Sequence, residues 1–347
     1  DLTRAGGRTS GRCCALRRHA LRSLQRPSWL HPIDLIALFV LLALPLGMFW
    51  ETTLGGKTLI PADNLYQWPP WDAYAEQVGV GVPHNELLSD LLLENYVWKR
   101  FVLRSFRQPG GLTNRLPLWN PYLWAGSPFL ADGQHSALYP FSLLFYVLPL
   151  ERAYGRFTVL QLWMAGAWTY VLARTLRTNR LGGLLAGIVY QLSLMYVVSV
   201  VFTMIIAAMA WLPLLLAVIE GVIRHQLRGG SGVTLPYVAA GALALGCQML
   251  AGHPEFVYYT GLVMGVYALS RLAWALIVMR GTRRAWARAT RAGLWLAVMV
   301  ALGMCLGAAQ FVPLYEFAAT SFRQGSASYE QIVGWAFPLR RVISLLI

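Results

Sequence analysis

The chain has 347 residues, of which 57% are hydrophobic and only 13% are charged. This composition excludes an ordinary soluble domain of that length and favours a polytopic membrane protein. The formal net charge of +14 does not indicate nucleic-acid binding, because the arginines cluster beside apolar spans and no stacking platform accompanies them. The four cysteines have no CxxC or metal-ligand spacing, which argues against structural zinc and a disulfide scaffold.

The chain starts with a basic tail, residues 1–31, which contains seven arginines and a single acid, Asp1. The apolar segment Pro32–Trp50 follows and is long enough to cross a bilayer. No small-x-small cleavage site follows it, so we expect a retained anchor rather than a signal peptide. The positive tail predicts a cytoplasmic N terminus, which places the next loop outside the cytoplasm.

That loop, residues 51–150, is long, polar and rich in aromatic residues. Its last part, Ala137–Leu150, is apolar but has only 14 residues, with Pro140 and Pro149 near its ends. This length is typical of an interfacial or re-entrant segment and is too short for a crossing. We therefore assign it to the loop.

Six further spans are predicted after the loop, which gives seven in total. They are Gly155–Leu176, Leu181–Val200, Met204–Ile223, Pro236–Gly252, Phe256–Met279 and Ala292–Val312. The short basic turns between them all fall on one side, and the predicted outer turns at 201–203 and 252–255 contain no Lys or Arg, as the positive-inside rule requires. The expected fold is an all-α polytopic membrane module over residues 32–347, with residues 313–347 starting a later outer loop.

The spans themselves contain few ionisable groups. Asp34 and Glu220 lie near span ends, and Arg271 is placed so that it could snorkel to the cytoplasmic surface. Pro213 could kink one span. Small residues in the segments GGLLAG and AAGALALG suit close packing between helices.

Chemistry is most plausible in the large loop. If the segment DLLLENYVW is helical, Asp90 and Glu94 share one face at i and i+4, and Trp98 follows one turn later. A carboxylate in such a position could act as a general base on a lipid-linked substrate, because aromatic neighbours exclude water and raise its pKa. Asp63 is a second candidate. The alternative is a solvated face on an interfacial helix that is anchored by Trp and Tyr.

Several polar side chains could contact a sugar or a phosphate through hydrogen bonds. In the first loop these are Asn85, Asn120, Asp132, Gln134 and His135, although Asn120-Pro121 and Asp132-Gly133 are also ordinary turn formers. On the other outer segments the candidates are His253, Glu255, Glu316 and Arg323. His253 could meet a phosphate or simply cap a turn, and Arg323 could hold a phosphate leaving group.

Four blocks carry a more specific signal: LLSDLLLENYVWKRF, RLPLWNPYLWAGSPFLADGQHSALYP, LAGHPEFVYY and AAQFVPLYEFAATSF. In this order and spacing, from about Pro61 to the end, the chain resembles the bacterial YfhO-type membrane proteins, a family similar to the GT-C glycosyltransferases. The resemblance implies a catalytic carboxylate in the first outer loop. Asp90, with the aromatic Tyr96 after it, matches that acid, and Asp63 is the second choice. Glu255 departs from the glutamine expected after GHP. Since family members are usually longer, the chain is expected to be an N-terminal fragment.

The resemblance implies a glycosyltransferase of the bacterial plasma membrane that moves a sugar from a polyprenyl-phosphate donor to an acceptor in the cell envelope, on the extracytoplasmic face. Asp90 would deprotonate the acceptor hydroxyl, and His253 or Arg323 would offset charge on the departing lipid phosphate. Asp63 would position the acceptor or share a divalent cation, and no other cofactor is expected. Two alternatives stay open: a transporter or flippase of lipid-linked saccharide, and a non-catalytic envelope assembly protein.

Overall fold

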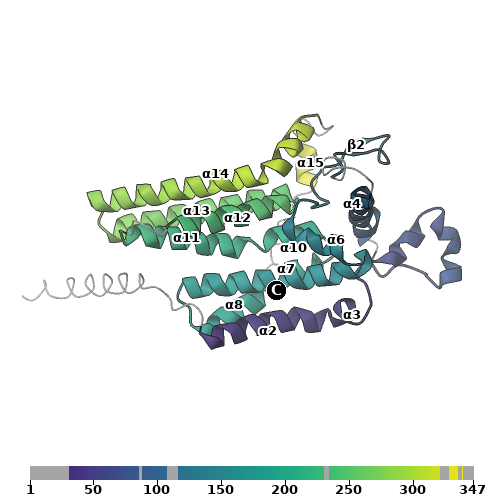
Figure 1. Cartoon of the computed structure of the whole chain (residues 1–347), viewed down its shortest axis with the longest axis horizontal. Coiled ribbons are helices and arrows are strands. Elements are labelled where there is room, and N and C mark those ends of the chain that lie inside the picture. Colours follow the sequence, from purple (N-terminus) through teal and green to yellow (C-terminus); the bar gives the residue numbers. More distant parts are fainter. Residues whose placement is uncertain are drawn as a thin grey trace, which may run out of the picture.

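The computed structural model describes residues 31–85, 88–107, 116–229, 234–320, 328–334 and 338. Long helices lie roughly side by side in a bundle, and the loop that precedes α7 folds over one end of it (Figure 1). In these ranges the β structure is a single antiparallel pair, β1 (Trp119–Asn120) with β2 (Ser127–Pro128). The fold is therefore all-α. We call the end under the loop the capped end and the opposite end the basic end.

The bundle is built from helices at the positions where the sequence predicts spans. They are α2 (Pro32–Met48), α7 (Leu150–Thr175), α8 (Arg180–Gln191), α9 (Leu194–Val198), α10 (Thr203–Met209), α11 (Leu212–Leu227), α12 (Thr234–Leu250), α13 (Pro254–Val278) and α14 (Arg283–Thr320).

Four helical stretches within the described ranges are long and apolar enough to cross a membrane: Arg180–Val198, Thr203–Leu227, Pro254–Val278 and Arg283–Thr320. The apolar helices α2 and α12 are shorter. The structure thus supports a membrane protein, while seven crossings remain a prediction.

Local sequence signals set several helix boundaries. His31 caps α2, whose Asp34 side chain accepts a hydrogen bond from the His31 backbone N–H in return. Asn179 caps α8 by accepting from the Gly182 N–H. The stretch Thr203–Leu227 is interrupted between α10 and α11, and Pro213, which could kink this span, lies in the first turn of α11. Proline suits that turn because its missing N–H would have no intrahelical partner there.

Small residues allow the helices to approach closely, as predicted. Gly187 of α8 faces α7 so closely that a Cβ would lie 2.8 Å from the carbonyl oxygen of Gly166. On the other side of the bundle, Gly241 of α12 packs against Met299 of α14 and Gly303 of α14 packs against Leu245. Without side chains at these points, van der Waals contact extends along both helix pairs.

The ionisable groups of the spans are paired. Arg271 does not snorkel: its Nε lies 2.7 Å from Oε2 of the fully buried Glu220, and its Nη2 lies 2.6 Å from Oε1. Arg224 donates to the same carboxylate at 2.6 Å. The pairing replaces snorkelling because a bidentate partner satisfies the guanidinium inside the bundle. The Arg-bearing turns α7–α8, α11–α12 and α13–α14 all lie at the basic end (Figure 1).

The capped end consists of short elements. In chain order they are α3 (Trp50–Thr53), η1 (Ala62–Gln67), η2 (Trp71–Tyr74), η3 (Glu76–Val78), η5 (Leu91–Tyr96), α4 (Val97–Arg107), β1, β2, η6 (Pro140–Ser142) and α6 (Leu143–Val147). In the segment 137–150 the helical elements before α7 are the short η6 and α6. That this segment does not cross a membrane stays a prediction. Phe145 of α6 is fully buried against Tyr154 and Phe157 of α7.

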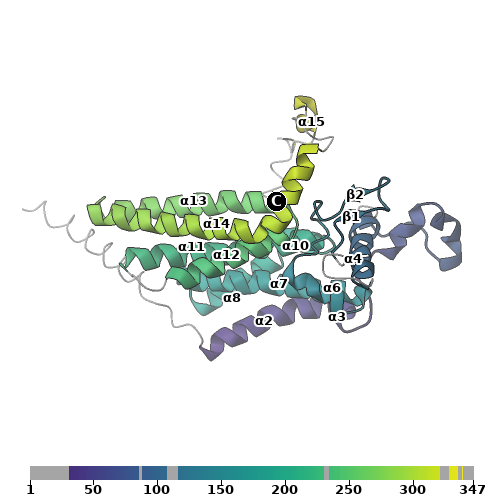
Figure 2. The same ribbon diagram turned by 45° about the horizontal axis from the view of Figure 1, so that its top comes forward.

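The last long helix extends past the predicted span. The span is predicted to end at Val312, whereas α14 continues as a helix to Thr320. The helix changes direction near its end (Figure 2), as expected where Pro313 cannot donate to the carbonyl four residues earlier. A separate short helix, α15 (Tyr329–Gly334), follows.

Candidate functional site

A pocket at the capped end contains two of the predicted acids. Asp90, Glu94 and Trp98 line it together, as helical spacing predicts, and we call it the carboxylate pocket. Its cavity volume is about 40 Å³, and it is partly open to solvent. The remaining lining residues are Leu91, Asn95, Gln134, Val201, Phe202 and Met204.

The helix that presents the acids is anchored by Asn95, which also lines the pocket. Asn95 is buried, and its Oδ1 accepts hydrogen bonds from the Tyr154 hydroxyl at 3.1 Å and from the Thr203 hydroxyl at 3.3 Å. Residues 91–96 form a π-helical turn that leads directly into α4. Such turns are rare and frequently occur at functional sites. The anchored turn holds Asp90 and Glu94 toward the pocket.

A third carboxyl group lies within electrostatic reach of these two. Burial, and then the negative charge of Glu94, raise the pKa of Asp132 to about 6. Burial, and then the charge of Asp90, raise the pKa of Glu94. Glu94 and Asp132 therefore both hold a proton to a higher pH than an ordinary carboxyl group does.

Lys99 of α4 is a buried cation that follows Trp98, a residue of the pocket lining. It is not among the residues predicted from the sequence. Its side chain is 2% exposed, and its Nζ donates to the His135 carbonyl at 3.2 Å and lies 4.2 Å from the centre of the Phe145 ring. Burial lowers its pKa to about 7. The available signal was helical spacing, since Lys99 repeats at i+4 from the buried Asn95 and at i−3 from the buried Val102.

Two predicted substrate contacts, His135 and Asn120, form hydrogen bonds with backbone groups of their own loop. Nδ1 of His135 accepts from the Ala137 N–H at 2.9 Å, so Nε2 carries the proton and donates to the Phe129 carbonyl at 3.0 Å. Burial and the charge of Lys99 lower the His135 pKa to about 4. Asn120 is buried, and its Oδ1 accepts from the Tyr122 N–H at 3.0 Å. Neither residue lines the carboxylate pocket.

Asp63 is also held by its own loop. It accepts hydrogen bonds from the backbone N–H of His84 at 3.0 Å and from its ring Nδ1 at 3.3 Å. The backbone bond is the main reason that the Asp63 pKa is lowered. Asp63 does not line the carboxylate pocket. Of the two candidate catalytic acids, Asp90 thus lines the pocket with Glu94 and Gln134, and Asp63 does not.

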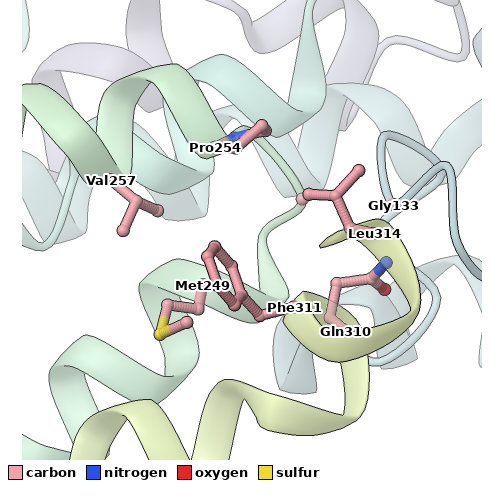
Figure 3. Close-up of a pocket in the computed structure, with 8 residues that line it drawn as sticks. Gly133, Met249, Pro254, Val257, Gln310, Phe311 and Leu314 are labelled. Carbon is pink, nitrogen blue, oxygen red and sulfur yellow. The ribbon is translucent and has the colours of Figure 1, made fainter. Parts of the chain in front are cut away.

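A second, mainly apolar pocket lies beside the first. Figure 3 shows its lining, and we call it the apolar pocket: Gly133, Met249, Gly252, Pro254, Val257, Gln310, Phe311 and Leu314.

Three of the four sequence blocks meet at this pocket. Gly252 approaches the loop at 133 so closely that a Cβ would lie 2.0 Å from the Gly133 carbonyl oxygen. The Ser136 hydroxyl donates to the Ala251 carbonyl at 2.6 Å, and Nε2 of Gln310 donates to the Leu130 carbonyl at 2.6 Å. The remaining block, LLSDLLLENYVWKRF, contacts the same loop through Lys99, which donates to the His135 carbonyl.

The other predicted contacts lie around the apolar pocket or beyond it. Nδ1 of His253 is buried without a hydrogen-bond partner among the described residues, and burial lowers the His253 pKa. Glu255 is exposed and accepts from the Tyr259 hydroxyl at 2.9 Å. Glu316 is exposed on the last turns of α14. Arg323 lies outside the described residues.

The described residues contain no group of three or more His, Cys, Asp or Glu side chains that could hold a metal ion. The fold and its apolar helices define the class of the protein, an all-α protein of membrane type. Comparisons with protein-family models, with curated proteins and with solved structures found no match.

Proposed function

We propose that the chain is a membrane glycosyltransferase that acts at the capped end, outside the cytoplasm. It transfers a sugar from a polyprenyl-phosphate donor to an acceptor in the bacterial cell envelope. The observation that carries the proposal is the carboxylate pocket, which Asp90 and Glu94 of one sequence block line together with Gln134 of another. Sidedness is inferred from the basic turns, which lie at the opposite end.

The chemistry assigned to the pocket is a displacement at the anomeric carbon. The acceptor hydroxyl attacks this carbon while Asp90 removes the hydroxyl proton, and the bond to the phosphate oxygen breaks so that the lipid phosphate leaves with the electron pair. Glu94 and Asp132 form a coupled pair whose raised pKa values, about 6 for Asp132, match a proton acceptor working near neutral pH. Gln134 can hydrogen-bond sugar hydroxyls through its amide.

The test is a transfer assay on the full chain in lipid nanodiscs, with a polyprenyl-phosphate sugar and envelope lipids as acceptors. We expect Asp90→Asn to reduce transfer by about 100-fold or more, since loss of a general base typically costs that much. Glu94→Gln is expected to shift the pH profile. The matched control is Glu76→Gln, because Glu76 is an exposed acid of the same loop that does not line the pocket.

Asp63→Asn separates the two candidate acids. The hydrogen bonds from His84 give Asp63 a structural role in the loop, so its variant is expected to keep substantial activity. Full transfer in Asp90→Asn and Glu94→Gln together would contradict the proposal. Vesicle flux of the lipid-linked saccharide without consumption of sugar would indicate a transporter instead, and absence of both would indicate an assembly protein.

A further inference from the structure

The apolar pocket borders the apolar surface of the bundle. The side chains of Met249, Val257, Phe311 and Leu314 line it, and they come from α12, α13 and α14. Only 11% of the α13 span is buried within the protein, so its outer face is left for lipid. Phe311 is 38% exposed, which connects the pocket lining to that surface. The lining of the pocket is therefore continuous with this exposed apolar face of the bundle.

One polar group in this pocket has an unused acceptor. Gln310 is 2% exposed, and its Nε2 donates to the Leu130 carbonyl, which fixes the orientation of the amide. Its Oε1 is buried and has no hydrogen-bond partner among the described residues. A buried amide oxygen without a donor is costly, so a ligand that supplies a donor gains affinity. A hydroxyl group supplies one, whereas an ionised phosphate offers only acceptors.

The two pockets share the same short loop. Gly133 lines the apolar pocket, and the next residue, Gln134, lines the carboxylate pocket. Consecutive Cα atoms are about 3.8 Å apart. A head group bound at Gln310 would lie beside Gly133, and the next residue, Gln134, lines the pocket of Asp90 and Glu94.

We propose that the apolar pocket binds the chain of a hydroxyl-bearing membrane lipid, whose head-group hydroxyl donates a hydrogen bond to Oε1 of Gln310. This lipid is the acceptor of the sugar. The role of this lipid as sugar acceptor rests on the proposed glycosyl transfer. The lipid-binding site itself rests only on the apolar pocket, the unpartnered Gln310 oxygen and the adjacent loop.

The test uses photo-crosslinking of the full chain in nanodiscs. The probe is a monoalkylglycerol with a diazirine in its chain, and the matched probes are its dimethyl ether and an alkyl phosphate of equal length. We expect cross-links at Met249, Val257 and Phe311. The dimethyl ether should label these positions roughly three- to tenfold less, since one net hydrogen bond is worth about 0.5–1.5 kcal/mol.

Val257→Trp fills the pocket, and Val266→Trp is its control because Val266 is 70% exposed on the same helix. Labelling of the pocket should fall about tenfold or more in the first variant and stay unchanged in the second. Equal labelling in both variants, or equal labelling by all probes, would overturn the inference. Stronger labelling by the alkyl phosphate would overturn the hydroxyl assignment.

Failure here is distinguishable from failure of the proposed function. Site-specific labelling without sugar transfer would leave a lipid site and remove the enzyme. Transfer that depends on Asp90 but is unaffected by Val257→Trp would keep the enzyme and remove this acceptor site.

Discussion

Replacement of Asp132 by asparagine is expected to stabilise the protein at neutral pH. Asp132 has an ordinary pKa of 3.8 that burial and the charge of Glu94 raise to about 6 in the folded chain. Because the folded state holds the proton more tightly than the unfolded state, the free energy of unfolding falls as the pH rises between these two values. Above about pH 6 the cost is fully present, and below about pH 4 it is absent.

The magnitude follows from the shift. The difference between about 6 and 3.8 is about 2.2 pH units, and at about 1.36 kcal/mol per unit it corresponds to about 3 kcal/mol. Asp132 is only partly buried by accessible area, so solvent screening reduces this figure and we expect a gain of about 1–3 kcal/mol. An asparagine of the same shape removes the charge and keeps a polar group.

The assay is chemical or thermal unfolding in detergent at about pH 7.5 and about pH 4.5, for wild type and Asp132→Asn. The gain should be largest at the higher pH and shrink at the lower one. Asp72→Asn is the control, because Asp72 is an exposed acid of the same loop. A loss of stability at about pH 7.5, or a gain that does not depend on pH, would refute the reasoning. If Asp132 serves the proposed reaction, the more stable variant should also transfer sugar more slowly.

Three further changes probe the same framework. Burial lowers the Lys99 pKa to about 7, so the folded state prefers the neutral amine and the free energy of unfolding should rise between about pH 7 and pH 10. Lys99→Met should flatten this rise, and an unchanged pH dependence of unfolding would contradict the reasoning. Gly252→Ala should lower the free energy of unfolding by about 2 kcal/mol or more, because φ of Gly252 is +88° and a Cβ would lie 2.0 Å from the Gly133 carbonyl oxygen. Gly265→Ala is the control in the same unfolding assay, and it should be neutral or mildly stabilising because the space around Gly265 is open. Glu220→Gln should cost about 3 kcal/mol, because it leaves the buried Arg224 and the partly buried Arg271 without their shared anion. Glu255→Gln, at an exposed carboxylate, should change thermal stability little, and equal effects of the two changes would contradict the buried pairing.

Short-range spacing accounts for what could be predicted in the candidate site. Asp90, Glu94 and Trp98 repeat at four-residue intervals, and any helix through them places their side chains on one face. Arginine placement likewise predicted which turns lie at the same end of the bundle.

Contacts between distant segments were beyond such reasoning. Asp132 looked like half of an Asp-Gly turn, and only the folded loop brings it within electrostatic reach of Glu94. Arg271 looked free to snorkel, but its partner Glu220 lies on another helix, α11. Lys99 is buried although lysine is among the residue types that are least often buried, so residue type alone predicts the opposite.

By itself, the sequence determined the all-α class, the positions of the apolar helices and the short segment at 137–150, because these depend on composition and on periodicity within one segment. Only the tertiary structure decided which acids share a pocket, that Asp63 is held by His84, and that Gln310 retains an unpartnered oxygen beside Gly133. These features depend on side chains from segments far apart in the chain, whose meeting is set by helix packing and loop closure.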